Sequence, residues 1–232
     1  MRRRGWYFPE VILSKMPISP KKAMVYLSTQ RIEAFSDGVF AIAITLLVLE
    51  IKVPHLGGFE SLWSALGHLW SSYLGYVFSF LMIGVYWANH HHIFNLYKKS
   101  DHYFVLLNVV FLMCISFLPF PTAVLAEYIA DETHRQAAMT FYAFGLLLPA
   151  ISWVSMWLYA VKGHRLVDPH LSPEFIAKTT RLFLLSNLMY LAAILVSLRN
   201  GIAGLILCTS LTVIFIQAPN EPAYIDENIN DH

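Results

Sequence analysis

The chain has 232 residues, of which 57% are hydrophobic and 15% aromatic, while only 13% are charged. Soluble globular domains carry about 25% charged residues, so this chain cannot cover its whole surface with charge. The composition also excludes a disordered, a collagen-like and a disulfide-stabilised chain. A net charge of +1 argues against a nucleic-acid binder, which would carry a strong basic excess. The composition therefore predicts a membrane protein.

Six apolar stretches are long enough to cross a bilayer as helices, which takes about 17–25 residues each. They are residues 31–51, 69–88, 103–125, 137–161, 182–198 and 201–217. We therefore predict an all-α, polytopic membrane protein with six transmembrane helices per subunit. This plan divides the chain into a cytoplasmic basic N-terminal arm (1–30), a six-helix transmembrane domain (31–218) and an acidic, disordered C-terminal tail (219–232).

Basic residues near the ends of the spans predict the orientation, because Lys and Arg there stay on the cytoplasmic side. Of the sixteen Lys and Arg residues, seven lie between the N-terminus and residue 31, two follow the second span and four follow the fourth. The three on the other side are Lys52, Arg135 and Arg199. This asymmetry predicts that both termini are cytoplasmic.

The head of the first span has the most distinctive sequence, Arg31-Ile-Glu-Ala-Phe35-Ser36-Asp37. At 1.5 Å per residue, Asp37 lies about 9 Å inside Arg31. One interpretation is that Ser36 and Asp37 cap a helix that begins there. The other is that they lie within the helix and need partners elsewhere. Arg31 and Asp37 project from different faces, so they cannot pair as an i,i+4 couple.

Polar residues of the second and third spans lie at about the depth of Asp37. The second span ends in Tyr86-Trp87-Ala-Asn89-His90-His91-His92, and the third carries Asn108 near its start. We therefore predict a polar network that supports the first helix at its cytoplasmic end. Its polar members are Arg31, Asp37, Trp87, Asn108 and His90 or His91, and Phe35 and Ser36 of the same stretch complete the supporting set. We expect His92 to be solvated at the membrane interface.

Another face of the first helix carries a stripe at positions i, i+3, i+4 and i+7, within about 100° of arc. Its members are Ile42, Thr45, Leu46 and Leu49. Asp37 projects elsewhere on the same helical wheel. The ordinary interpretation of such a stripe is a packing face, and a pore lining is the alternative. The stripe by itself does not decide between them.

The R-x-x-x-F-S-D sequence resembles the signature of the transmembrane protein 175 family, the endosomal and lysosomal potassium channels and their prokaryotic relatives. The end of the second span, from Tyr86-Trp87 to His91, is similar as well, as is Phe117-Leu-Pro119-Phe-Pro121-Thr122 in the third. Animal members have two six-helix repeats, whereas this chain has one, like the prokaryotic members. The resemblance therefore implies a homotetramer in a prokaryotic cell (inner) membrane.

The resemblance also implies a central pore that the first helix of each subunit lines. It assigns the narrowest constriction to Ile42, further apolar rings to Leu46 and Leu49, and a hydroxyl layer to Thr45. The chain has no T-V-G-Y-G filter, so selectivity would come from dehydration of the ion at an apolar ring and would be modest. The expected function is passive conduction of potassium ions across the lipid bilayer, with no cofactor, catalytic residue, resident metal or nucleic-acid partner.

Other functions compete with a potassium channel. A metalloenzyme or haem protein is disfavoured, because three consecutive histidines point in three directions and no H-E-x-x-H motif occurs. A secondary transporter would show inverted repeats and helices broken near the midplane, and the sequence shows no repeat. A proton-permeable channel of the same architecture and a structural membrane protein without transport remain open.

Overall fold

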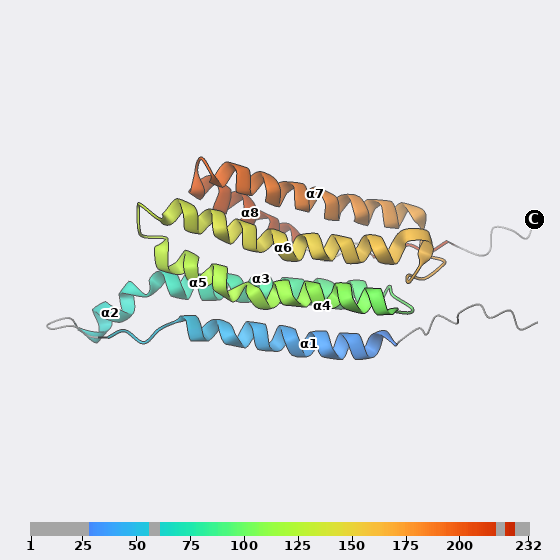
Figure 1. Ribbon diagram of the computed structural model, residues 1–232, viewed down its shortest axis with the longest axis horizontal. Helices are drawn as coiled ribbons and strands as arrows, with labels where there is room; N and C mark the ends of the chain where they lie inside the picture. The colour runs from blue at the N-terminus through green and yellow to red at the C-terminus, as the bar shows by residue number, and fades with distance from the viewer. Residues whose placement is uncertain (1–27, 56–60, 217–220, 226–232) are drawn as a thin grey trace, which may run out of the picture.

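The computed structural model describes residues 28–55, 61–216 and 221–225, without the side chains of 212–214. The described residues form a bundle of helices that run side by side along its long axis (Figure 1). The helices are α1 (Thr29–Leu46), α2 (Leu62–His68), α3 (Trp70–Phe94), α4 (His102–Phe117), α5 (Pro119–Tyr128), α6 (Arg135–Val161), α7 (Pro173–Ser197) and α8 (Gly201–Ile216). Two 3-10 turns, η1 (Leu47–Glu50) and η2 (Lys162–His164), extend α1 and α6.

Five helical segments are long and apolar enough to cross a membrane within the described residues. They are Thr29–Glu50, Trp70–Phe94, His102–Tyr128, Arg135–His164 and Pro173–Ser197. Each coincides with one of the first five predicted spans. The sixth predicted span corresponds to α8, which is apolar but has only 16 residues. The prediction of an all-α protein with several apolar spans is confirmed.

The α6 helix lies at the centre of the bundle and contacts α4, α5, α7 and α8. It is the most buried of the five spans. The α1 helix lies at the edge, where it packs on α3 and α4, and α7 lies on the opposite side (Figure 1). One side of α1 is therefore left uncovered within a single subunit.

Three helix boundaries differ from the prediction. The α1 helix begins at Thr29, so Ser36 lies inside the helix and the capping interpretation is wrong. The third span is divided between α4 and α5 at Leu118, because Pro119 lacks the N–H that a continuous helix would use. The α7 helix begins at Pro173, well before residue 182. Ser172 is its N-cap and accepts a hydrogen bond from the backbone N–H of Phe175.

The short helix α2 was not predicted. Its N-cap, Ser61, accepts a hydrogen bond from the backbone N–H of Ser64 at 3.2 Å. A helix of seven residues is too short to show a recognisable apolar period.

Part of the predicted disordered tail is ordered against the loop between α6 and α7. The backbone N–H of Ser172 donates to the carbonyl of Ala223 at 2.8 Å, and that of Ile225 donates to His170 at 2.8 Å. These bonds pair residues 221–225 with the loop, so the prediction is wrong there. Residues 1–27 of the predicted arm, and 219–220 and 226–232 of the predicted tail, lie outside the described residues.

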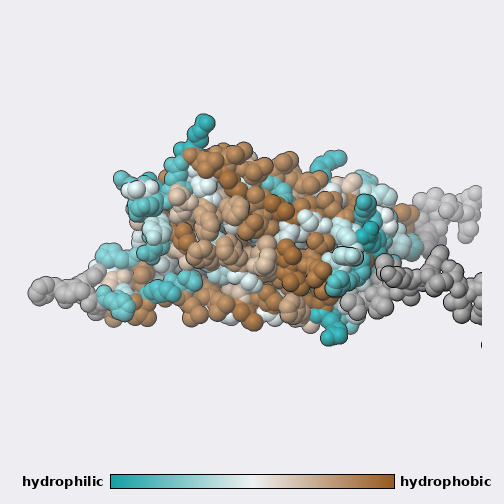
Figure 2. All heavy atoms as spheres, viewed as in Figure 1, coloured by the Kyte–Doolittle hydropathy of each residue, from teal (hydrophilic) through white to brown (hydrophobic). Residues whose placement is uncertain are grey.

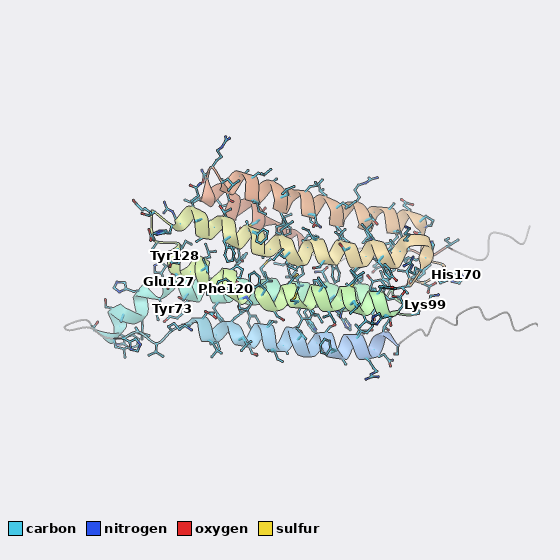
Figure 3. The ribbon with its side chains drawn as sticks, viewed as in Figure 1. Tyr73, Lys99, Phe120, Glu127, Tyr128 and His170 are labelled. Atoms are coloured by element: carbon cyan, nitrogen blue, oxygen red, sulfur yellow. The ribbon has the colours of Figure 1, made fainter. Side chains whose placement is uncertain are left out.

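The two ends of the bundle differ from its middle in polarity. Hydrophobic residues cover much of the middle of the visible face, and hydrophilic residues gather toward both ends (Figure 2). The start of α1, the α3–α4 turn with Lys99, and the α6–α7 loop with His170 all lie at one end, which we call the basic end (Figures 1 and 3). An apolar belt between two polar ends is the surface expected of a protein that lies in a bilayer.

A carboxylate organises the loop at the basic end. Asp168 accepts a hydrogen bond from the backbone N–H of His170 at 2.9 Å and lies 3.6 Å from the ammonium of Lys98. The hydrogen bond from the backbone N–H of His170 is the main cause of the lowered pKa of Asp168. The hydrogen bond from the His170 side chain and the positive charge of Lys98 also lower it. The α3–α4 turn and the α6–α7 loop are thereby joined.

Candidate functional site

The two faces of α1 have different surroundings. The residues that face α3 and α4 are buried and recur every three to four positions: Ile32, Ser36, Phe40, Ala43 and Leu47. The predicted stripe lies on the other face. Ile42 and Leu49 are each 61% exposed, Leu46 is 46% exposed, and Thr45 is exposed as well. All four stripe residues are therefore available to a neighbouring subunit, to a pore or to lipid.

Thr45 is the polar member of this exposed stripe. Its hydroxyl lies 2.9 Å from the carbonyl oxygen of Ala41 and 3.0 Å from that of Ile42. The helix backbone thus accepts the hydroxyl hydrogen, as is common for threonine within helices. The oxygen of Thr45 is left to present its lone pairs on the exposed face.

Three buried polar residues from three helices form a continuous chain at the basic half of the bundle. The amide Nδ2 of Asn108 donates to Ser36 Oγ at 3.0 Å, and Asn108 Oδ1 lies 3.1 Å from His90 Nε2. Ser36, Asn108 and His90 are each at most 1% exposed. These hydrogen bonds join α1, α4 and α3, so they fix α1 against both neighbours.

The number of hydrogens that each group can donate fixes the direction of the hydrogen bonds between Ser36, Asn108 and His90. Ser36 has one hydroxyl hydrogen and donates it to the carbonyl of Ile32 at 2.8 Å, so Ser36 must accept from Asn108. The amide oxygen of Asn108 then faces His90. Because that oxygen can only accept, His90 Nε2 carries the proton in this hydrogen bond.

Aromatic rings enclose the imidazole of His90. Its ring stacks on Phe94 and on Phe111, with centroids 4.0 and 5.8 Å away, and Phe40 approaches edge-on at 5.5 Å. The ring of Trp153 lies 6.0 Å away. This enclosure leaves His90 without access to water or to a passing ion, so His90 can position a helix but is not placed to bind a permeant ion.

Asp37 makes a second, separate tie between α1 and α3. Trp87 Nε1 donates to Asp37 Oδ1 at 2.9 Å, and both residues are exposed. The Trp87 ring stacks on His91 with centroids 6.4 Å apart. Trp87 is the residue that brings Asp37 and His91 into one group.

Other predicted residues lie outside these contacts. Arg31 and Phe35 are exposed, and within the described residues Arg31 makes no hydrogen bond or ion pair. His92 is partly buried instead of solvated, and its Nε2 has no hydrogen-bond partner in the part of the chain that the structure describes. The enclosing rings of Phe40, Phe111 and Trp153 were not predicted, because aromatic residues in a span give no signal that distinguishes an enclosure from ordinary packing.

The described residues contain no group of three or more His, Cys, Asp or Glu side chains that could hold a metal ion. What they do contain is a set of long apolar helices, buried polar ties between them, and an uncovered apolar face on the first helix. These features define an all-α, multi-pass integral membrane protein.

Comparison with known proteins identifies the family. The profile of the family described as the endosomal/lysosomal potassium channel TMEM175 matches residues 31–119. A protein of Streptomyces collinus named as a potassium channel is 42% identical over 160 residues, which cover 69% of this chain and 78% of that protein. The chain therefore belongs to the TMEM175 family of ion channels, as the signature at the head of α1 predicted, and it is not an enzyme.

A solved structure agrees with this assignment. The crystal structure of a lysosomal potassium-selective channel TMEM175 homolog from Chamaesiphon minutus matches with a TM-score of 0.72 and 40% identity, covering 81% of this chain and 96% of that one. An animal relative, the endosomal/lysosomal proton channel TMEM175 of Gallus gallus, is 37% identical over 132 residues, but these cover only 26% of its length. The bacterial relatives indicate that this chain is a multi-pass protein of a prokaryotic membrane.

Proposed function

We propose that the chain forms a homotetrameric, modestly potassium-selective channel whose pore is lined by α1 of each subunit. The observation that carries this proposal is the exposed stripe on α1, which stays uncovered while the opposite face of the same helix is buried. Two bacterial relatives at 42% identity are named as potassium channels. Four copies of the uncovered stripe around one axis would enclose a narrow apolar path.

In this proposal Ile42 forms the constriction. An apolar ring supplies no oxygen ligands, so an ion must shed part of its water to pass, and potassium holds its water less tightly than sodium. Leu46 and Leu49 extend the apolar path, and the Thr45 oxygen offers a lone pair between them. Such a ring can also close by dewetting.

The buried chain of Ser36, Asn108 and His90 would serve the pore by positioning α1. A ring of four side chains changes its diameter whenever the helices that carry it rotate or slide. The hydrogen bonds of Asn108 resist both movements, because they join α1 to α3 and to α4 at a single level. The tie between Trp87 and Asp37 opposes rotation from another side of α1.

The proposal also includes six crossings and cytoplasmic termini. The α8 helix packs on α6 and α7, begins just after the turn that ends α7, and runs back toward the basic end (Figure 1). Although α8 has 16 residues, it is apolar along its length. The Lys and Arg residues at the basic end support its cytoplasmic location by the positive-inside rule.

Ion flux from liposomes tests the pore assignment. Purified protein in potassium-loaded liposomes should release potassium passively and faster than sodium. Ile42→Asn should wet the ring and raise sodium flux by about tenfold, the effect of lowering a barrier by about 1.4 kcal/mol. Leu188→Asn is the matched control, because Leu188 is 63% exposed but lies on α7, across the bundle from α1.

The outcomes of this experiment separate the competing functions. A folded tetramer that passes no potassium would contradict the channel. Flux that is saturable and strictly coupled to a second ion would favour a secondary transporter. Several animal relatives are named as proton channels, so a pH-sensitive dye inside the same liposomes should be read in parallel. Proton entry without potassium release would favour the proton-permeable channel.

A further inference from the structure

The proline-rich segment from Phe117 to Thr122 forms the junction of α4 and α5, in the half of the bundle opposite the basic end (Figure 1). Pro119 and Pro121 have no backbone N–H, so two of the hydrogen bonds that would continue α4 into α5 are missing. In Figure 1, α5 turns from the line of α4 toward α6. The backbone of α4 therefore does not fix the position of α5, and contacts with other helices must do so.

Buried hydroxyl groups bind α5 to its neighbours. Thr122 donates its one hydroxyl hydrogen to the carbonyl of Leu118 at 2.9 Å, so in its 2.7 Å contact with Ser79 of α3 it accepts. Ser79 thus donates to Thr122, which leaves the Ser79 oxygen to accept in its hydrogen bond with Tyr142 of α6. Ser79, Thr122 and Tyr142 are each at most 4% exposed. The three hydroxyl groups therefore join α5, α3 and α6.

Two glycines let α5 approach these neighbours closely. A Cβ atom at Gly145 of α6 would lie 2.7 Å from Cγ of Pro121, so a larger residue would require the helices to shift. A Cβ atom at Gly75 of α3 would lie 3.4 Å from Cγ2 of Thr122, so α3 and α5 are in close contact as well. The α5 helix is therefore held from two sides, by α3 and by α6.

The end of α1 that is distant from the basic end packs on this assembly. The turn η1, which continues α1, contacts both α3 and α5. Its buried residue is Leu47, which is 1% exposed, and Leu46 and Leu49 of the stripe lie on either side of Leu47 in the sequence. The α1 helix is thus supported at two depths, by α3 and α4 at Ser36 and by α3 and α5 at Leu47.

Supports at two depths control the tilt of α1, whereas a single support would leave the helix free to pivot. Leu49 lies 13 residues beyond Ser36 in the sequence, and Ile42 lies 6 residues beyond it. At 1.5 Å per residue these separations are about 20 Å and about 9 Å. A tilt of α1 about Ser36 would therefore move Leu49 about twice as far as Ile42.

We propose that α5 is the second support of α1, and that Thr122, through its hydrogen bond with Ser79, is a positioning residue for the stripe. The inference rests on the proposed pore, because it concerns the diameter of the rings that the stripe forms. Thr122 fixes α5 against α3, and these two helices together fix η1. Loss of the hydrogen bond lets this end of α1 tilt outward, so the ring at Leu49 widens more than the ring at Ile42.

Distances between spin labels in the assembled protein test this position. The label is attached to Leu49→Cys or to Phe35→Cys, on a background in which Cys114 and Cys208 are replaced by alanine. Thr122→Val keeps the shape of the side chain and removes the hydroxyl. The distances among the Leu49→Cys labels should then lengthen by about 3–4 Å, as an outward shift of about 2 Å requires. The Phe35→Cys distances should not change, because Phe35 lies at the depth of the other support.

Ion flux from liposomes gives a second readout. The ratio of sodium flux to potassium flux does not depend on how much of the protein is folded, so a loss of stability alone leaves it unchanged. Thr122→Val should raise this ratio about threefold, because a wider apolar ring demands less dehydration. Thr122→Ser keeps the hydroxyl and should restore the wild-type ratio.

Thr140→Val is the matched control for both readouts. The hydroxyl of Thr140 also donates to the carbonyl four residues earlier, that of Gln136, and also bonds to a serine of a neighbouring helix, Ser197. This bond joins α6 to α7, on the side of the bundle away from α1 (Figure 1). Thr140→Val should therefore leave the label distances and the flux ratio as in the wild type.

Gly145→Ala examines the opposite movement. Its Cβ atom would press on Pro121 and push α5 away from α6, which brings α5 closer to η1, so the Leu49→Cys distances should shorten. Gly84→Ala on α3 is the control, because a Cβ atom there meets no atom of another helix within 4 Å among the described residues. The comparison of Thr122→Val with Thr122→Ser decides the question even if Gly145→Ala does not fold.

Different results would overturn the support and the pore. Leu49→Cys distances that are well defined in the wild type and unchanged in Thr122→Val would overturn the support but leave the pore in place. A raised flux ratio that Thr122→Ser does not restore would also overturn it. Leu49→Cys labels without any defined distance between subunits in the wild type would contradict the tetrameric pore, and the support with it.

Discussion

The two faces of α1 differ from those of a helix on a soluble protein. In a soluble protein the buried face is apolar and the exposed face polar. Here the buried face includes the hydroxyl of Ser36 and its hydrogen bond to Asn108, whereas the exposed stripe is apolar except for Thr45. Lipid tails are as apolar as leucine, so a membrane protein can leave an apolar face uncovered at little cost. A polar group has no partner in lipid and must find one inside the bundle.

The comparison has a functional consequence. The buried face is constrained, because each of its polar atoms needs a particular partner. Among the described residues, the side chains of the exposed stripe make no hydrogen bond to another helix, so the stripe can vary with the requirements of an ion path. We therefore expect substitutions on the buried face to change stability, and substitutions on the stripe to change conduction.

The largest expected effect separates two phenylalanines of α1. Phe40 is 1% exposed and contacts His90 and Phe111, whereas Phe35 is 59% exposed. Phe40→Ala should lower the free energy of unfolding by about 3 kcal/mol, because it leaves a cavity in a packed core. Phe35→Ala should change it by less than about 0.5 kcal/mol. Denaturation in detergent measures both. Equal losses would show that the exposed face of α1 is packed against a neighbouring subunit.

The next effect concerns the centre of the buried polar chain. Asn108→Ala leaves Ser36 and His90 without their shared partner, so the free energy of unfolding should fall by about 1–2 kcal/mol. Asn95→Ala is the control, since Asn95 is exposed and, within the described residues, its side chain bonds only to the carbonyl of His91 in the last turn of α3. Unchanged stability in Asn108→Ala would mean that the hydrogen bonds between Ser36, Asn108 and His90 do not hold α1 in place.

A smaller effect is expected at the exposed tie between α1 and α3. Asp37→Ala removes the acceptor for Trp87 and should cost about 1 kcal/mol, whereas Asp37→Asn keeps an oxygen there and should cost less than half of that. The emission maximum of tryptophan fluorescence and the unfolding midpoint would report the change. If the asparagine variant is as unstable as the alanine variant, the negative charge of Asp37 matters more than its hydrogen bond to Trp87.

The smallest effect lies outside α1 and follows pH. The pKa of Asp168 is lowered in the folded chain from its ordinary value of 3.8. Its ionised form therefore stabilises the fold above that value, and the stabilisation is lost as the pH falls through the folded-state pKa. Wild-type protein should exceed Asp168→Asn in unfolding midpoint at pH 7, and the difference should shrink as the pH falls below 3.8 and through the lowered folded-state pKa. A difference that persists at low pH would assign the role of Asp168 to something other than its charge.

The positions of the spans could be predicted because apolarity is a property of each local stretch. The limits of the helices were harder to predict. The signal for the true start of α7, Ser172 followed by Pro173, is present in the sequence, but Lys178 and Arg181 interrupt the apolar count there. The division of the third span at Leu118 likewise follows from Pro119, which an average over many residues conceals.

The polar site was predicted as a set of residues at one depth, but its connections were not. Depth follows from counting residues along a helix, and this brought Asn108 and the histidines to the level of Asp37. Whether His90, His91 or His92 faces Asn108 depends on how α3 is rotated, and packing against the rings of Phe111 and Trp153 sets that rotation. The structure brings His90 to Asn108 and places His91 against Trp87 instead.

The sequence by itself therefore determined that this protein lies in a membrane, about where its helices cross, and that the head of the first helix is exceptional. Those properties reside in composition and in short motifs. Only the tertiary structure decided which face of α1 is buried and which partners its polar atoms meet. The partners of Asp37 and Ser36 lie 50 and 72 residues further along the chain. In lipid each polar atom must find such a partner, and the packing of the helices decides which one it meets.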